Sequence, residues 1–234
     1  MTTTLPPPFD AVLFDAGGVL VLPDPPTMRQ LLAAHGGSDD LADYHRAHYA
    51  GMYAKSTAGA AEAHWESYNL AYVDAVGVSS GDRKAIAAAL GAVRTADTWS
   101  WPIADSVAAL RALSEMGVPL GVVSNASGQI EGVLAAQGIC QVGRGPAVEV
   151  RVVVDSHVVG VTKPDPRIFD FALTHFAGIE RSRIAYVGDS YALDVVSSRA
   201  AGLHPILIDP HNDHVGADVD RITSLEALVA RWDR

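Results

Sequence analysis

The sequence predicts an α/β protein, a doubly wound parallel sheet into which an all-helical domain is inserted. Short apolar runs recur along the chain, and several are rich in β-branched residues with no polar residues in alternation. Such runs are typical of strands that are covered on both faces. From residue 100 onward they alternate with segments of helical periodicity, which is the pattern of a parallel sheet flanked by helices.

Five apolar runs are predicted to be strands of this sheet. The first, Ala11–Phe14, ends at Asp15 and is followed by two glycines, as expected of a buried strand that breaks into a turn. The other runs are 118–123, 150–154, 184–187 and 205–208. The predicted helices of the core are 103–116, 128–137, 166–176, 191–201 and 224–232.

The chain is predicted to divide into two domains. Residues 1–24 and 98–234 form the α/β core, and residues 25–97, which lack a strand-like run, form a helical cap. Prolines mark both junctions, at 23–26 and at Pro102, as is typical of hinges between a core and a lid.

Composition excludes several classes of protein. The chain has 234 residues, 49% of them hydrophobic, so it can bury a sizeable core and is not disordered. The net charge of −10 argues against nucleic acid or an anionic membrane surface as partner. Cys140 is the single cysteine, expected to be a buried, inert thiol. With no signal peptide or spanning segment in view, we expect a cytoplasmic protein.

Polar side chains with catalytic potential follow the predicted strands. In an open α/β sheet, ligands bind beyond the carboxyl ends of the strands. The residues at or near these ends are Asp15, Ser124, Asn125, Lys163, Asp189 and Asp194. An attacking carboxylate, a hydroxyl, a fixed cation and further carboxylates suit phosphoryl transfer to an aspartate. Converging carboxylates would repel one another unless a hard divalent cation lay between them, so we expect Mg²⁺ as cofactor.

Four segments resemble, in order, the motifs of the haloacid dehalogenase-like (HAD) hydrolases, in the form with a helical cap inserted after the first strand. The segments are 14–20, 122–125, 160–166 and 187–194, and the resemblance covers essentially the whole chain. It implies a Rossmannoid core with Asp15 as the nucleophile that becomes aspartyl-phosphate. It also implies that Ser124 and the backbone of Asn125 bind the phosphoryl oxygens, while Lys163 neutralises nucleophile and phosphate.

The same resemblance implies how the metal is held. Asp15, Asp189 and the main-chain carbonyl of Gly17 would ligate Mg²⁺, and Asp194 would support the metal's water shell or the lysine. The implied reaction is hydrolysis of a phosphate monoester, with a small phosphorylated metabolite as substrate.

Gly17 departs from the family pattern. Phosphatases of the family usually carry a second aspartate there, which protonates the leaving oxygen and then deprotonates the attacking water. General acid–base catalysis of this kind is typically worth about 10²- to 10⁴-fold in rate. The substrate could have a leaving group that needs little help, or a cap residue such as His45 or His48 could supply the acid. A phosphomutase is disfavoured, because returning the phosphoryl group requires the same acid.

Two alternatives to a phosphatase stay open. The dehalogenase branch of the family uses the first aspartate, here Asp15, without metal, but it usually has an aromatic residue where Gly17 stands and lacks the acidic pair represented by Asp189 and Asp194. The chain could also be a catalytically weak relative that binds a ligand or a protein partner.

The cap sequence contains many aromatic residues between positions 44 and 72. We expect most of them to pack cap helix against cap helix, and one or two to face a flat or apolar part of the substrate. The histidines in the segment 211–214 follow Pro210 in a polar turn, and we expect a solvated loop there rather than a metal site.

Overall fold

A six-stranded sheet, parallel throughout, forms the core of the computed structural model, which describes residues 8–59, 65–78 and 83–232. The strand order is β10-β9-β8-β1-β4-β7. The strands are β1 (Ala11–Phe14), β4 (Leu120–Ser124), β7 (Val153–Asp155), β8 (Ile184–Gly188), β9 (His204–Ile208) and β10 (Asp220–Ile222). The predicted fold class, a doubly wound parallel sheet with helices on its faces, is confirmed.

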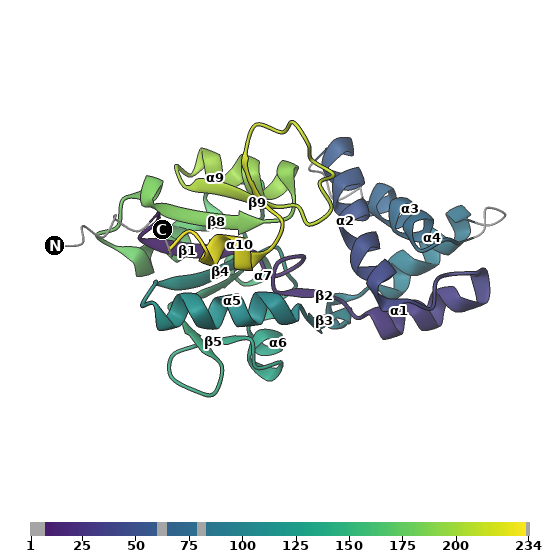
Figure 1. Cartoon of the computed structure of the whole chain (residues 1–234), viewed down its shortest axis with the longest axis horizontal. Coiled ribbons are helices and arrows are strands. Elements are labelled where there is room, and N and C mark those ends of the chain that lie inside the picture. The colour runs from purple at the N-terminus through teal and green to yellow at the C-terminus, as the bar shows by residue number, and fades with distance from the viewer. Residues whose placement is uncertain (1–7, 60–64, 79–82, 233–234) are drawn as a thin grey trace.

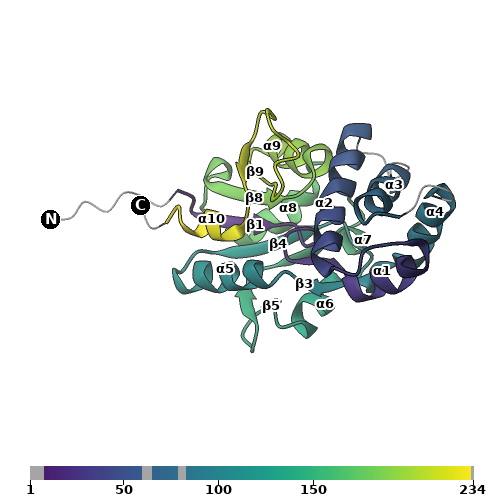
Figure 2. The same cartoon turned by 45° about the vertical axis from the view of Figure 1, so that its right-hand side comes forward.

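Successive residues of β1 point to opposite faces of the sheet and enter two separate apolar clusters. Val12 and Phe14 pack in the cluster covered by α5 (Ala104–Glu115), α6 (Ile130–Ala136) and α10 (Leu225–Val229). Ala11 and Leu13 pack in the cluster covered by α8 (Ile168–Leu173) and the 3₁₀ turn after it. Figure 1 and Figure 2 show the sheet between these layers. All four residues are fully buried, so β1 reads as a continuous apolar run.

The structure differs from the prediction over residues 150–154. The predicted single strand is wrong: β6 (Val148–Val150) pairs with β5 (Cys140–Val142) in a small separate sheet, and only β7 joins the main sheet. Between them the backbone N–H of Arg151 donates to Leu120 O, so the chain crosses from one sheet to the other there. Cys140 is buried, and burial raises the pKa of its thiol to about 12, as an inert thiol requires.

The helical segment predicted for 191–201 begins as a π-helical turn, Tyr191–Val195, and continues as α9 (Val196–Ala200). Ser190 caps this segment, because its hydroxyl accepts a hydrogen bond from Leu193 N. Within the described ranges no helix is both long and apolar enough to cross a membrane.

The described residues between Pro25 and Val93 form a helical cap beside the sheet. Its helices are α1 (Pro25–Leu32), α2 (Leu41–Ala58), α3 (Trp65–Ala75) and α4 (Arg83–Val93). Asp24 caps α1 and two prolines open its first turn, which explains why the helix begins there. The cap has its own core, in which Tyr44, Tyr68 and Tyr72 are fully buried. Most of the aromatic stripe therefore packs within the cap.

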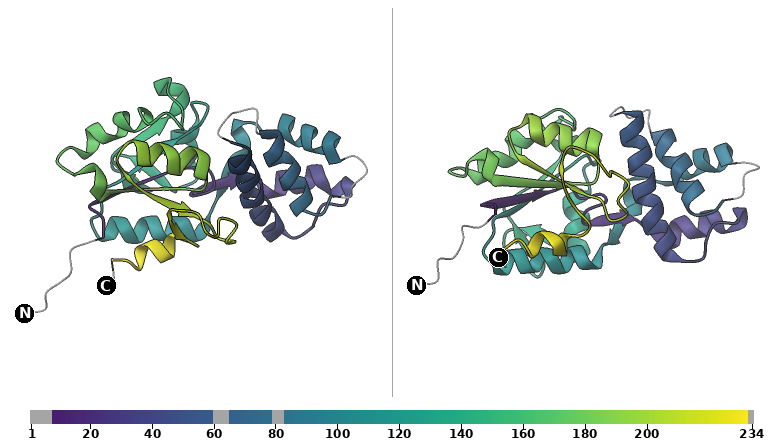
Figure 3. Two further views of the ribbon diagram at one scale, coloured as in Figure 1. Left: turned by 90° about the horizontal axis from the view of Figure 1, so that it is seen from above. Right: turned by 45° about the horizontal axis from the view of Figure 1, so that its top comes forward.

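Two short antiparallel strands connect the cap to the core. They are β2 (Val21–Pro23) and β3 (Trp99–Pro102), which carry the chain into and out of the cap. The sequence suggested only proline-marked linkers here. Figure 3 shows the cap standing beside the carboxyl edge of the sheet, joined to the core through this narrow connection.

Candidate active site

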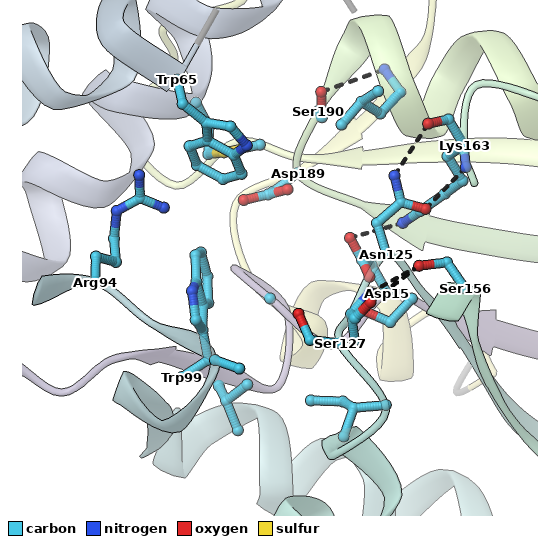
Figure 4. A pocket seen from close by; sticks show the side chains of 18 of the residues that line it. Asp15, Trp65, Arg94, Trp99, Asn125, Ser127, Ser156, Lys163, Asp189 and Ser190 are labelled. Atoms are coloured by element: carbon cyan, nitrogen blue, oxygen red, sulfur yellow. Dashed lines mark hydrogen bonds and ion pairs between the residues drawn. The ribbon is translucent and has the colours of Figure 1, made fainter. Parts of the chain in front are cut away.

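The parallel sheet brings the predicted site residues to one edge. Phe14 is paired with Val122 of β4 and with Val187 of β8, so the residues that follow each strand lie next to one another. A cavity of about 540 Å³ opens at this edge between core and cap. Of the residues predicted from sequence, it is lined by Asp15, Gly17, His48, Ser124, Asn125, Lys163 and Asp189. Figure 4 shows four of them, Asp15, Asn125, Lys163 and Asp189, around the cavity. Asp194 lies just behind them and is buried.

Two glycines, Gly18 and Gly188, leave room for the carboxylates of Asp189 and Asp194 to lie against the backbone. Gly18 has a φ of +68°, and a Cβ there would overlap the Asp189 carboxylate and approach His48. A Cβ on Gly188 would overlap the Asp194 carboxylate. At both positions a larger residue would collide with a carboxylate, so glycine is required. At Gly18 the positive φ also favours glycine.

Asp15, Asp189 and Asp194 form a buried acidic cluster. Each offers one oxygen, and these oxygens lie within 4.8 Å of one another. Burial raises the pKa of Asp15 to about 6, and the neighbouring carboxylates add to the effect, although Lys163 opposes it. Burial and the neighbouring Asp194 raise the pKa of Asp189 well above its ordinary value. Three buried carboxylates with like charges repel one another, and a hard divalent cation such as Mg²⁺ bound between their oxygens would remove that repulsion.

Lys163 is the cation inside this cluster. Its Nζ lies 2.8 Å from Asp15 Oδ2 and 2.7 Å from Asp194 Oδ1, and it donates to the Tyr186 hydroxyl at 2.8 Å. Burial lowers the pKa of Lys163, but the two carboxylates outweigh burial and hold it above its ordinary value. The ammonium therefore stays charged and favours the ionised form of Asp15.

Asn125 fixes the loop that carries Lys163. Its Nδ2 donates to Lys163 O at 3.0 Å, and its Oδ1 accepts from Lys163 N at 2.8 Å. The sequence pointed to the Asn125 backbone as a phosphate ligand, and the role of its side chain in positioning the lysine was missed. Ser124, the last residue of β4, is buried and lines the cavity beside Asn125.

Replacing Asn125 by alanine is expected to lower the free energy of unfolding by about 1–3 kcal/mol, because both hydrogen bonds to the backbone of Lys163 are lost. We also expect kcat to fall by about tenfold, since a lysine displaced by even 1 Å stabilises the nucleophile less well. Denaturant unfolding and steady-state kinetics measure the two effects. The exposed Gln137 provides the control for loss of an amide, and equal effects of the two substitutions would contradict the positioning role.

The family model for haloacid dehalogenase-like hydrolases matches residues 9–202. The chain belongs to the HAD-like hydrolases. The family membership predicted from the four motifs is thereby confirmed.

Curated relatives match parts of this HAD hydrolase. Haloacid dehalogenase-like hydrolase domain-containing protein 3 of Danio rerio is 33% identical over 137 residues, which cover 56% of this chain and 53% of the relative. The phosphoserine phosphatase of Thermus thermophilus is 41% identical over 68 residues, 29% of this chain and 27% of the relative. The match thus spans about half or less of the length of these relatives.

Solved structures share the fold along nearly the whole chain. The HAD phosphatase of Thermococcus onnurineus superposes with a TM-score of 0.58 at 20% identity, covering 94% of this chain and 95% of that chain. The HAD-hydrolase YfnB of Bacillus subtilis, solved bound to magnesium, gives 0.60 at 16% identity, covering 97% and 99%. At this level of identity the likeness shows the fold alone.

In this HAD hydrolase the Trp99 side chain of β3 packs directly against Gly17. A Cβ on Gly17 would lie 2.9 Å from Cζ3 of the Trp99 ring, closer than two carbons pack. The indole therefore stands where the side chain of a second aspartate would begin. This pairing of a small residue with a large one was not visible in the sequence, because the two lie on different segments.

The structure gives no support to His45 or His48 as a substitute acid. His48 Nε2 lies 2.8 Å from Asp189 Oδ2 and Nδ1 lies 3.0 Å from the Tyr68 hydroxyl. Burial lowers the pKa of His48 to about 3, so the ring is neutral near pH 7. Burial likewise lowers the pKa of His45 to about 4. The His45 ring packs against Tyr49 and is not part of the cavity lining. A neutral imidazole of such low pKa is a poor proton donor.

Helix α2 docks the cap onto the core. The Tyr49 hydroxyl donates to Gly18 O at 2.8 Å, and Arg46 makes a two-pronged ion pair with Asp213, each contact 2.7 Å. The segment 211–214, predicted to be a solvated loop, therefore contacts the cap. Among the described residues, the one cluster of three or more possible metal ligands is the acidic cluster of Asp15, Asp189 and Asp194, and it includes no residue of this loop.

Proposed function

We propose that this HAD hydrolase removes phosphate from a small organic monoester through an aspartyl-phosphate on Asp15, with Mg²⁺ as cofactor. The observation that carries the proposal is the contact of Asp15 with Lys163 at 2.8 Å inside a buried cluster of three carboxylates. Relatives support it: the matches include a phosphoserine phosphatase and Pyrimidine 5'-nucleotidase YjjG of Escherichia coli, 38% identical over 61 residues.

The first step is attack of an Asp15 carboxylate oxygen on phosphorus. The new O–P bond forms as the ester O–P bond breaks, and the leaving oxygen takes up a proton from solvent or leaves as an anion. Lys163 holds Asp15 ionised and offsets the charge on the phosphoryl group, while the Ser124 hydroxyl and the Asn125 N–H bind its oxygens. Mg²⁺, held by Asp15, Asp189 and the Gly17 carbonyl with Asp194 in support, would supply further neutralisation of phosphate charge.

In the second step water attacks the phosphorus of the aspartyl-phosphate: the new O–P bond forms as the bond to Asp15 breaks, which releases phosphate and regenerates the carboxylate, and the proton of the water passes to the released phosphate or to solvent. Gly17 offers no side chain to take the proton of this water, and His48 is held by Asp189 and Tyr68. The same absence leaves no side chain at position 17 to protonate the leaving oxygen in the first step, so the site suits substrates whose leaving group needs little protonation, such as acyl phosphates, anhydrides and anomeric sugar phosphates. The cap covers one side of the cavity and reduces the access of bulk water.

The test is a screen for phosphate release from small phosphorylated metabolites, with and without Mg²⁺. We expect turnover that requires the metal and favours good leaving groups. Chloride release from a 2-haloacid without metal would instead support the dehalogenase alternative. Ligand binding with no turnover of any compound would support a catalytically weak binding protein, and either outcome would contradict the phosphatase proposal.

Metal binding should also change the dependence of stability on pH. In the metal-free protein the pKa of Asp15 is raised to about 6 from an ordinary 3.8, so the folded state binds this proton more tightly than the unfolded chain. The contribution of Asp15 to the free energy of unfolding should therefore fall by about 3 kcal/mol as the pH rises from about 4 to 6. Mg²⁺ should restore stability more strongly at pH 7 than at pH 5.

Denaturant unfolding at each pH, with Mg²⁺ or with a chelator, measures this effect. The variant Asp15→Asn should lose part of the pH dependence, because one of the raised carboxyls is removed. If Asp15→Asn and the natural protein show the same pH dependence between pH 4 and 6, the pKa of Asp15 is not raised as described.

A further inference from the structure

The cavity extends from the acidic cluster into the cap, where it has a second set of charges. Lys55 of α2 and Arg94, just after α4, line it together with Trp65 and Asn69 of α3. Figure 4 shows Arg94 and Trp65 on the opposite side of the cavity from Lys163. Neither cation is among the site residues predicted from the sequence.

Both cations are held in place by the Trp65 ring. Lys55 Nζ lies 3.8 Å from the ring centroid, and the Arg94 guanidinium lies 4.1 Å from it. Arg94 also lies 4.5 Å from the Tyr68 ring and donates from Nη2 to Asn69 Oδ1 at 2.9 Å. Contacts of this kind orient a guanidinium and reduce the entropy lost when it binds a ligand.

Lys55 is 1% exposed, which is unusual for a lysine. It lies near enough to the core that its charge lowers the pKa of Asp189. The ammonium thus faces the cavity and not bulk water. Charge interactions in the buried cavity are stronger than at the protein surface.

The charged lining of the cavity is divided between its two ends. Among the described lining residues the carboxylates are Asp15 and Asp189, both on the core, whereas the cap contributes Lys55 and Arg94. The phosphoryl group would occupy the core end, beside Lys163. A volume of about 540 Å³ is in the range of pockets that hold a whole metabolite, so room for the rest of the substrate extends toward the cap.

We propose that Lys55 and Arg94 form a second anion-binding subsite, which selects phosphomonoesters that carry another negatively charged group, a carboxylate or a second phosphate, at the end remote from the ester. This proposal rests on the proposed phosphatase function and names its substrate class. Two cations facing one cavity favour an anionic tail over a hydroxyl tail, since each charge-assisted hydrogen bond is stronger than a neutral one.

The aromatic residues favour this assignment over a base-stacking site. The Trp65 and Trp99 rings lie 6.4 Å apart at 67° to each other, an edge-to-face contact, so they do not form a parallel slot for a flat ring. The face of the Trp65 ring instead contacts the two cations, Lys55 and Arg94.

The experiment uses a matched series of synthetic aryl phosphates, whose leaving oxygen needs little protonation, with a para side chain of one to four carbons that ends in a hydroxyl, a carboxylate or a phosphate. The series of lengths identifies the separation between ester and tail at which the preference is greatest. kcat and KM are measured for each compound with Mg²⁺. We expect the best anionic tail to raise kcat/KM over the hydroxyl tail of the same length by at least tenfold, chiefly through KM. The carboxylate and phosphate arms show which anion is preferred.

Charge removal tests the assignment to these residues. Lys55→Gln and Arg94→Gln should each reduce the preference for the anionic tail by about tenfold or more, whereas Lys84→Gln, on the exposed face of α4, should leave the preference intact. The ratio of two substrates on one enzyme is insensitive to the fraction of folded protein. It therefore remains informative if the buried Lys55 variant is unstable, and Arg94→Gln supplies the second test.

Failure of this proposal is distinguishable from failure of the proposed function. Turnover with equal kcat/KM for hydroxyl and anionic tails at every length would overturn the subsite and leave the phosphatase assignment standing. If no compound is hydrolysed, calorimetric binding of the same series decides the matter. Tighter binding of anionic tails, lost in Lys55→Gln and Arg94→Gln, supports the subsite, and the absence of such a preference overturns it.

Discussion

Replacing Asp15 by asparagine is expected to reduce kcat/KM by at least about 10⁴-fold, because the amide cannot form an aspartyl-phosphate and removal of a covalent nucleophile typically costs this much. Asparagine has nearly the same shape, so the loop after β1 should keep its conformation. The charge of Lys163 would then be balanced by Asp194, which lies 2.7 Å from its Nζ. Phosphate release at saturating Mg²⁺ measures the loss.

The sequence offers a matched control for this substitution. Asp10 occupies the same tripeptide context as Asp15, Phe-Asp-Ala, but it precedes β1 and pairs with Arg183 at the surface. Asp10→Asn should therefore retain full activity. Equal activity of Asp15→Asn and the natural protein would show that the reaction proceeds without this nucleophile.

Restoring an aspartate at position 17 is expected to raise activity on alkyl phosphates by about 10²-fold, but only when Trp99 is also made smaller. The single substitution Gly17→Asp places its Cβ 2.9 Å from the indole, so either the loop or the ring must move and activity should fall. In the double variant Gly17→Asp, Trp99→Ala the carboxyl has room. The proper reference is Trp99→Ala alone, because Trp99 also packs against His48 and Trp65.

Leaving-group dependence separates proton transfer from other effects in this pair of variants. The gain should be large for an alkyl phosphate and small for an aryl phosphate, whose leaving oxygen needs little protonation. The double variant Gly17→Asn, Trp99→Ala fills the same space without an acid and should show no gain. If it gains as much as the aspartate variant, the effect comes from cavity shape and proton transfer does not limit the natural enzyme.

The core part of the site could be predicted from the sequence because it follows from strand ends. Asp15, Ser124 and Asp189 each stand at or directly after an apolar run, and parallel strands present these ends at one edge. The strand β10 was not predicted, because its sequence is not an apolar run. It is three residues long and contains Asp220 and Arg221, so it lacks the apolar signal.

The cap part could not be predicted, because it depends on how α2, α3 and α4 pack against one another. Lys55 and Arg94 are separated by most of the cap sequence, and nothing in their own segments marks them as neighbours of one indole ring. The two histidines show the same limit. Their spacing places His45 and His48 on one helix, but the burial that lowers their pKa values comes from contacts that form only when α2 docks on the core.

The central place of β1 has a consequence for synthesis on the ribosome. This fully apolar strand is translated early, yet it lies between β4 and β8, and Phe14 pairs with Val187. A nascent chain must therefore keep an aggregation-prone segment unpaired on one side until β8 has emerged. Chaperone binding to that segment would be most useful during this interval, and no fragment released before Asp194 could assemble the acidic cluster.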